Sequence, residues 1–147
     1  MREVTDRNKI AEFVRRLGRQ ARAECRVFFT GGVTAVWEGW REATMDIDLC
    51  FEPELDEIFR ALPEIKENLD LNVELAAPSN FIPELPGWRD RSRYVGREGK
   101  VSFYNYDPYS QALSKIERRH EKDLMDVDQM FKTNLIKRTK LLELLIR

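Results

Sequence analysis

The residues best suited to chemistry are two aspartates that stand two positions apart. Asp46 and Asp48 alternate with apolar residues, as in a half-buried β-strand, so both carboxylates leave the same face of the strand. Two neighbouring carboxylates repel each other, and a bound divalent cation relieves that repulsion. Mg²⁺ prefers one or two protein carboxylates and completes its octahedron with water and substrate phosphates. The pair therefore predicts a Mg²⁺ or Mn²⁺ site, and the alternative is a solvated strand edge.

A third carboxylate and a glycine pair accompany this motif. Glu74 lies on the next expected strand, where a side chain facing the same way as the aspartates completes a three-acid metal site; the alternative is an acid that faces solvent. Gly31 and Gly32 lie between an expected strand and a short helix, where exposed backbone N–H groups can hold phosphate. An ordinary tight turn is the alternative for the glycines. Together these residues predict a site for a cation and a phosphate-bearing ligand.

The hydrophobic pattern predicts the elements that must position these residues. The expected helices cover residues 5–23, 33–38, 53–65, 109–121, 123–131 and 139–146, and the expected strands cover residues 25–30, 46–51, 71–76, 94–95 and 101–106. Thr5 or Asp6 is expected to cap the first helix, and Asp107 followed by Pro108 to begin the helix after the last strand. Residues 78–93 are expected to form a long loop.

This order of elements indicates an α+β (α/β) fold, with a mixed β-sheet flanked by helices and a small C-terminal helical part. The length of 147 residues suits one domain, residues 1–147, with a core at about 25–107 and C-terminal helices at about 108–147. The 25 Lys and Arg residues nearly balance the 26 Asp and Glu residues, which excludes a globally basic nucleic-acid coat.

The sequence lacks the features typical of membrane and secreted proteins. No apolar stretch approaches the roughly 20 residues needed to cross a bilayer, and the N-terminal residues carry acids and lack the apolar centre of a secretory signal. Cys25 and Cys50 are too few for a disulfide framework and are expected to be reduced, buried side chains. We therefore expect a cytoplasmic protein that does not enter a membrane.

The glycine pair, a gap of thirteen residues and the Asp-Ile-Asp-Leu strand at 46–49 resemble the signature of the nucleotidyltransferase superfamily with a DNA polymerase β-like fold. Residues 41–48 read REATMDID, which is similar to the R-x-T-x-D-I-D form of AbiEii-type proteins, a group that includes toxin nucleotidyltransferases. The segments KIERR at 115–119 and KDLMD at 122–126 are similar to the helical lysine and R/K-D-x-x-D segments of those proteins. The resemblance covers about residues 27–130.

The resemblance implies transfer of a nucleoside monophosphate from an NTP to an acceptor hydroxyl with release of pyrophosphate, supported by two Mg²⁺ or Mn²⁺ ions. The implied metal ligands are Asp46, Asp48 and Glu74, which together with Lys115 form the implied catalytic set. The implied nucleotide-binding residues are Gly31, Gly32, Thr34, Arg41, Thr44, Lys115 and Arg119, with Asp123 and Asp126 orienting Lys115 or Arg119. At position 74 the chain has Glu where many superfamily members have Asp.

Several alternatives stay open at this point. The chain is either such an enzyme, within or outside a toxin–antitoxin system, or a non-catalytic nucleotide-, RNA- or partner-binding module on the same fold. The acceptor is open between RNA and protein, and an antitoxin is a candidate partner. The apolar stripe at residues 141–146 either covers the sheet or forms a homodimer seam.

Three further features have a structural interpretation as well as a functional one. The arginine- and aromatic-rich segment at 88–94 suits RNA, but Trp88 packing onto the core is the favoured interpretation. Lys115 suits a phosphate contact or simply a polar helix end. His120 is expected to be a surface residue, because no serine or cysteine motif accompanies it.

Overall fold

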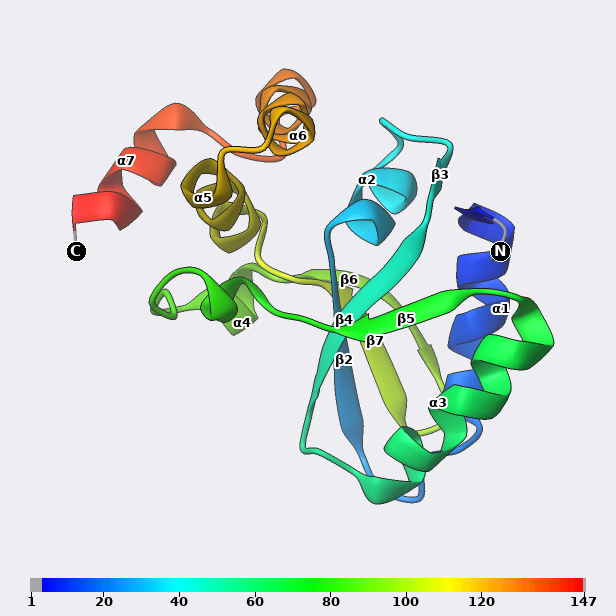
Figure 1. Ribbon diagram of the computed structural model, residues 1–147. Helices are drawn as coiled ribbons and strands as arrows, with labels where there is room; N and C mark the ends of the chain where they lie inside the picture. Colours follow the sequence, from blue (N-terminus) through cyan, green and yellow to red (C-terminus); the bar gives the residue numbers. More distant parts are fainter. Residues whose placement is uncertain (1–3, 147) are drawn as a thin grey trace. The chain divides into compact units, whose positions relative to one another are not determined.

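The computed structural model describes residues 4–146 (Figure 1). Residues 1–3, part of the segment from which the absence of a secretory signal was predicted, lie outside the described residues, as does residue 147. The contacts separate two compact units, one formed by the chain up to Ala77 with Tyr94–Asn105, the other by Pro78–Arg93 with Tyr106 onward. The single domain expected from the length stays a prediction.

The first unit contains most of the expected strands. Its helices are α1 (Arg7–Gly18), α2 (Gly32–Glu38) and α3 (Asp56–Leu69). Its strands are β1 (Thr5–Asp6), β2 (Cys25–Thr30), β3 (Ala43–Thr44), β4 (Asp46–Glu52), β5 (Asn72–Leu75), β6 (Arg93–Glu98) and β7 (Val101–Asn105). Five strands form one sheet in the order β5-β4-β2-β7-β6, and β1 pairs with β3 separately. Because β2 is antiparallel to β4 but parallel to β7, the sheet is mixed and the expected α+β class is confirmed.

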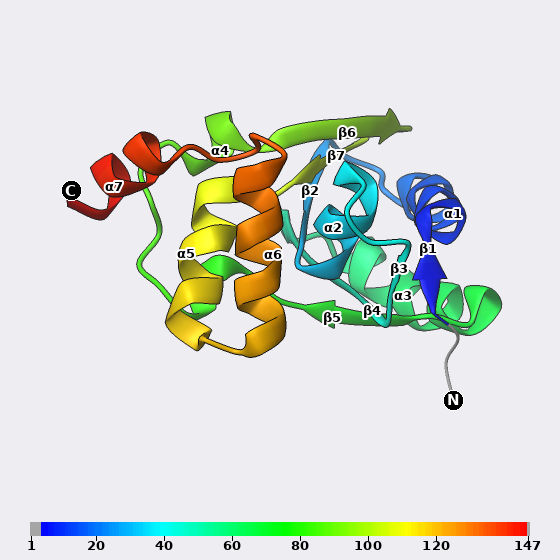
Figure 2. The same cartoon turned by 90° about the horizontal axis from the view of Figure 1, so that it is seen from above.

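One face of the five-stranded sheet forms the core of this unit. Helices α1 and α3 lie side by side against that face (Figures 1 and 2). The alternating residues of the strands meet them there, with Phe29 stacked on Phe103 and in tilted contact with Phe13. The residues between these core residues on each strand therefore point to the opposite face of the sheet.

The boundaries of two helices differ from the prediction. The helix expected over residues 5–23 covers only Arg7–Gly18, because Thr5 and Asp6 pair with β3 as a short strand. Asp6 is the N-cap, as expected, and its carboxylate accepts a hydrogen bond of 2.9 Å from the backbone N–H of Lys9. The helix expected from residue 53 or 54 begins at Asp56 and continues to Leu69, with Pro63 inside it.

The second unit is helical. It contains the 3₁₀ helix η1 (Pro78–Asn80) and helices α4 (Trp88–Arg91), α5 (Pro108–Arg118), α6 (Glu121–Lys132) and α7 (Arg138–Ile146). The long loop expected over residues 78–93 therefore includes two short helices. Helices α5 and α6 lie side by side (Figure 2). Among residues 4–146, the structure has no helix that is both long and apolar enough to cross a membrane.

The start of α5 is anchored by a buried carboxylate. Asp107 accepts a hydrogen bond from the backbone N–H of Tyr109, which confirms the predicted cap. Its Oδ2 atom also accepts hydrogen bonds from Nε and Nη2 of Arg91, at 3.1 and 2.8 Å, and from the hydroxyl of Ser110 at 2.7 Å. This network joins α4 to the first turn of α5, so Asp107 has a structural role in the second unit.

Candidate active site

Asp46 and Asp48 lie on the face of β4 that points away from the core. Every second residue of β4 is buried, and Ile47 and Leu49 are fully buried in the core. The two aspartates fall between these residues and are half-buried. Their placement on one face, predicted from the alternation, is therefore confirmed.

The neighbouring strands extend this polar face. Asp48 pairs in register with Thr30 of β2 on one side and with Glu74 of β5 on the other. Directly opposite residues on adjacent strands share a face, so these three side chains form a row across the sheet. Glu74 is exposed, and Thr30 is buried. The row thus runs from a buried hydroxyl to a solvent-exposed carboxylate.

Asn72 is a residue of this face that the sequence analysis missed. It pairs in register with Asp46, and its Nδ2 atom donates a 2.8 Å hydrogen bond to Oδ1 of Asp46. Its position two residues before Glu74 on the same strand was the available signal, because residues i and i+2 of a strand share a face. The candidate site therefore contains an amide donor as well as carboxylates.

The three carboxylates were predicted to hold a metal ion together. In the part of the chain that the structure describes, no group of three or more His, Cys, Asp or Glu side chains is arranged to hold a metal ion. The expected three-acid site is thus not preformed, and the role of Glu74 as a ligand stays a prediction. Asp46 and Asp48 nevertheless fit Mg²⁺, which takes one or two protein carboxylates and fills its other positions with phosphate and water.

The glycine pair brings the backbone close to these acids. A Cβ atom at Gly31, whose φ is +63°, would lie 3.0 Å from Oδ2 of Asp48. A Cβ atom at Gly32 would lie 1.9 Å from Oγ1 and 2.6 Å from Cβ of Thr44. Both positions therefore need glycine for a close approach, and the turn after β2 lies directly beside Asp48. The two glycines thus allow close packing of this turn against Asp48 and Thr44, and their role in holding phosphate stays a prediction.

Replacing Gly32 by alanine is expected to lower the free energy of unfolding by about 1–3 kcal/mol. The new methyl group would overlap the side chain of Thr44, including its Cβ atom, on the short strand β3. Urea unfolding followed by circular dichroism measures the change. Gly96→Ala is the matched control, since a Cβ atom there meets no heavy atom within 4 Å, and its effect should stay within about 0.5 kcal/mol. Equal effects of the two substitutions would show that the Gly32–Thr44 contact is not tight.

The other residues expected to bind nucleotide near this turn have structural contacts. Thr34 is 1% exposed, and its hydroxyl lies 3.2 Å from Oδ1 of Asn105, which is itself fully buried. Thr44 donates its hydroxyl to the backbone carbonyl of Asp46 at 3.3 Å. Arg41 is half-buried and follows α2. Thr34 and Thr44 thus support the turn and the start of β4, and the nucleotide-binding roles of Thr34, Arg41 and Thr44 stay predictions.

The second unit contains the expected lysine and its two acids. Nζ of Lys115 on α5 lies 3.0 Å from Oδ2 of Asp126 and 3.5 Å from Oδ1 of Asp123, both on α6. All three side chains are at most 9% exposed. The expected pairing of Asp123 and Asp126 with Lys115 is confirmed, whereas the arginine that reaches Asp123 is Arg118, at 3.5 Å, and not Arg119. This buried cluster ties α5 to α6.

A match to a family model shows the family to which the chain belongs. The sequence model of a family described as "nucleotidyltransferase of unknown function" (DUF6036) matches residues 8–146. The chain belongs to this family. Searches of the curated proteins and of the solved structures found no match to the chain. This match confirms the expected relation to nucleotidyltransferases. It does not extend to the more specific AbiEii-type assignment.

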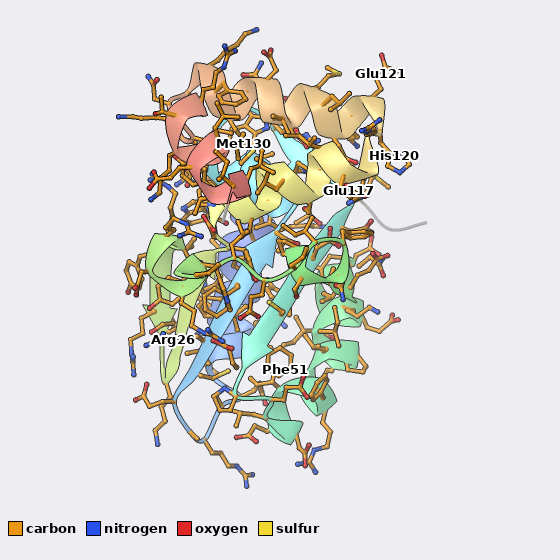
Figure 3. The ribbon with its side chains drawn as sticks, turned by 90° about the vertical axis from the view of Figure 1, so that its left-hand side faces the viewer. Arg26, Phe51, Glu117, His120, Glu121 and Met130 are labelled. Atoms are coloured by element: carbon orange, nitrogen blue, oxygen red, sulfur yellow. The ribbon has the colours of Figure 1, made fainter. Side chains whose placement is uncertain are left out.

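The structure also shows the surroundings of two other candidate residues, Trp88 and His120. Trp88 is buried and stacks on Tyr106, with ring centroids 4.3 Å apart, so the favoured structural interpretation of this tryptophan is confirmed. His120 is exposed at the turn between α5 and α6, with Glu117 and Glu121 close to it in Figure 3. Neither residue is assigned to the candidate site.

The two cysteines lie on adjacent strands, and Cys25 is buried as expected, whereas Cys50 is half-buried because it lies on the same face of β4 as Asp48. Burial raises the pKa of the Cys25 thiol to about 11 and that of the Cys50 thiol to about 12. Because the thiolate is the nucleophile, alkylation by iodoacetamide at pH 8 is expected to be at least about 100-fold slower in the folded protein than in urea, where thiols have pKa values near 8.5. Mass spectrometry of timed samples measures both rates, and similar rates would contradict the raised pKa values of these thiols.

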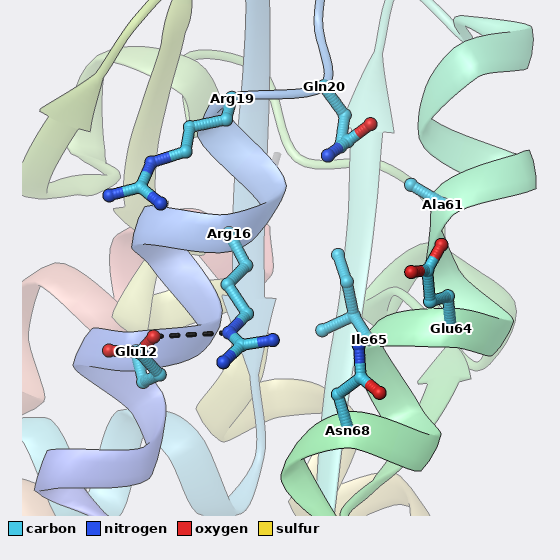
Figure 4. Close-up of a pocket in the computed structure, with 8 residues that line it drawn as sticks. All are labelled: Glu12, Arg16, Arg19, Gln20, Ala61, Glu64, Ile65 and Asn68. Atoms are coloured by element: carbon cyan, nitrogen blue, oxygen red, sulfur yellow. Dashed lines mark hydrogen bonds and ion pairs between the residues drawn. The ribbon is translucent and has the colours of Figure 1, made fainter.

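A groove of about 360 Å³ lies elsewhere in the first unit, between α1 and α3 (Figure 4). It is lined by charged and amide side chains, including an ion pair in which Nε of Arg16 is 3.1 Å from Oε1 of Glu12. Since α1 and α3 cover the core face of the sheet, this groove is separate from the face that carries Asp46 and Asp48.

Proposed function

We propose that this member of the family is a Mg²⁺- or Mn²⁺-dependent nucleotidyltransferase that moves a nucleoside monophosphate from an NTP to an acceptor hydroxyl. The observation that carries the proposal is the arrangement of Asp46 and Asp48 on one strand face, directly beside the close-packed Gly31-Gly32 turn. Family membership supports the kind of reaction and an NTP as the substrate. The sheet supplies the carboxylates on a rigid element.

In this proposal Asp46 and Asp48 hold the cations, and the backbone at Gly31 and Gly32 faces the triphosphate. When bound, the cations neutralise phosphate charge and stabilise the attacking and leaving oxygens. The acceptor oxygen forms a bond to the α-phosphorus, the bond from that phosphorus to the bridging oxygen breaks, and pyrophosphate leaves. Glu74, exposed at the end of the row, is the group we propose to take the proton of the acceptor hydroxyl.

The test is an assay for transfer with NTPs radiolabelled at the α-phosphate. The protein is incubated with each NTP, with Mg²⁺ or Mn²⁺, and with RNA, protein or small-molecule acceptors, and both labelled products and pyrophosphate are measured. The proposal expects metal-dependent labelling of one acceptor class that disappears with EDTA. Metal-dependent NTP binding without pyrophosphate release from any acceptor would instead indicate a non-catalytic nucleotide- or RNA-binding module.

We further propose an AbiEii-type role as one component of a toxin–antitoxin pair in the cytoplasm. The support is the similarity of residues 41–48 to the R-x-T-x-D-I-D form of that group. A neighbouring reading frame that encodes a small protein, whose co-expression relieves growth arrest caused by this chain, is the expected finding. Growth unaffected by expression of the chain alone would contradict a toxin role.

A further inference from the structure

We propose that Asn72 is a positioning residue that holds the Asp46 carboxylate in place for cation binding; this inference rests on the proposed function. Asn72 and Asp46 are directly opposite on β5 and β4, and the amide donates to Oδ1 of Asp46 at 2.8 Å. No other side chain donates to Asp46 among the hydrogen bonds found within residues 4–146. The proposal concerns orientation, since Asn72 contributes no charge.

The neighbourhood of Asp46 explains why such a donor is needed. Asp48 leaves the same strand face two residues later, and Glu74 follows opposite Asp48, so the negative charges repel one another when no cation is present. A free aspartate side chain would rotate away from its neighbours. The hydrogen bond from Asn72 occupies one acceptor site of the carboxylate, which has about four, and leaves the others for ligands.

The chemistry of the amide suits this task. A lysine or arginine opposite Asp46 would neutralise the carboxylate and compete with a cation, whereas a neutral amide donor orients it and keeps its full charge. The donor itself is held firmly, because both chain neighbours of Asn72, Leu71 and Val73, are buried in the core. Partners that hydrogen-bond to metal ligands typically change metal affinity by 10- to 100-fold when they are removed.

The experiment measures cation binding, and it does not require the nucleobase of the NTP or the acceptor molecule to be known. Mn²⁺ with inorganic tripolyphosphate is titrated by calorimetry into the wild type, Asn72→Leu and Asp46→Asn. Asn72→Leu keeps the branched shape and the number of heavy atoms of the side chain but removes the donor. Asn68→Leu is the matched control, because Asn68 is exposed on α3 in the groove of Figure 4, on the other side of the sheet. Urea unfolding checks each variant, and Asn72→Ala replaces Asn72→Leu if that variant does not fold.

The expected result is about a 10-fold weaker binding of Mn²⁺-tripolyphosphate in Asn72→Leu, with no change in Asn68→Leu. In the transfer assay the Mg²⁺ concentration for half-maximal rate should rise by a similar factor, while kcat at saturating Mg²⁺ stays near that of the wild type. If Asn72→Leu binds as the wild type does while Asp46→Asn loses binding, Asn72 only joins two strands and the inference is wrong. If Asp46→Asn also binds normally, the proposed function itself is wrong.

Discussion

Replacing Asp48 by asparagine is expected to reduce the rate of nucleotidyl transfer by at least about 1000-fold. The substitution removes one of the two carboxylates that fit the cations and leaves the shape of the side chain unchanged. A bound cation stabilises the charge of the transition state by several kcal/mol, and about 4 kcal/mol corresponds to a factor of about 1000 in rate. The transfer assay with labelled NTP measures the loss, and kcat should fall at every Mg²⁺ concentration.

The same substitution is expected to leave the fold intact and to raise the free energy of unfolding by up to about 1 kcal/mol when no cation is present. The reason is that Asp48 lies directly opposite Glu74, and like charges in that arrangement destabilise a pair of strands. Loss of activity with equal or higher stability therefore separates a catalytic role from a structural one. Urea unfolding in EDTA measures the change.

A carboxylate on the same strand provides the control. Glu52 lies on the same face of β4 as Asp48, four residues further along, and pairs with Arg26 of β2. Glu52→Gln should retain nearly full activity, because that end of the strand lies roughly 13 Å away. If Asp48→Asn kept more than a tenth of the wild-type rate, or if Glu52→Gln lost as much, the assignment of the acidic face would be wrong.

Replacing Lys115 by methionine is expected to lower the free energy of unfolding by about 3 kcal/mol. Methionine keeps much of the length of the side chain but removes the cation, so the buried carboxylates of Asp123 and Asp126 lose the ammonium group that lies 3.5 and 3.0 Å away. Removing one partner of a buried ion pair typically costs about 3–5 kcal/mol. Arg118, which is partly exposed and lies 3.5 Å from Asp123, offsets part of this cost.

An exposed ion pair on α6 serves as the comparison. Nζ of Lys132 lies 2.9 Å from Oδ2 of Asp128, but both side chains are more than half exposed. Lys132→Met should change stability by less than about 0.5 kcal/mol, because solvent screens such pairs. Urea unfolding of both variants gives the two values. Equal values would show that the Lys115 cluster is hydrated and does not hold α5 and α6 together.

Much of the first unit was predictable because its strands alternate clearly. The alternation around Asp46 and Asp48 specified both the strand and the face of the carboxylates, and the glycine pair specified the turn before α2. Asn72 was not predicted as a site residue, because its importance depends on the register between β4 and β5. Its spacing from Glu74 indicated the shared strand face, but register is a tertiary property, so the sequence could not show that Asp46 lies opposite Asn72.

Where the prediction failed, tertiary contacts outweighed local preference. Thr5 and Asp6 extend a helical pattern, yet Thr5 is buried opposite Thr44 in a small second sheet, so the helix begins later. Thr34 and Thr44 were implied to bind nucleotide; their hydroxyls hydrogen-bond to the protein, and that binding role stays a prediction. In the second unit, the family resemblance implied that Asp123 and Asp126 meet Lys115, and the structure brings these residues together.

The measurement that tests the central claim most directly is calorimetric titration of each of the four NTPs, with and without Mg²⁺, into the wild type and the Asp46→Asn/Asp48→Asn double variant. We predict that at least one NTP binds the wild type only when Mg²⁺ is present. We also predict that its affinity falls at least about 100-fold in the double variant, equivalent to about 2.7 kcal/mol. Equal Mg²⁺-dependent binding by the double variant, or no binding of any NTP by the wild type, would contradict a cation-assisted nucleotide site at Asp46 and Asp48.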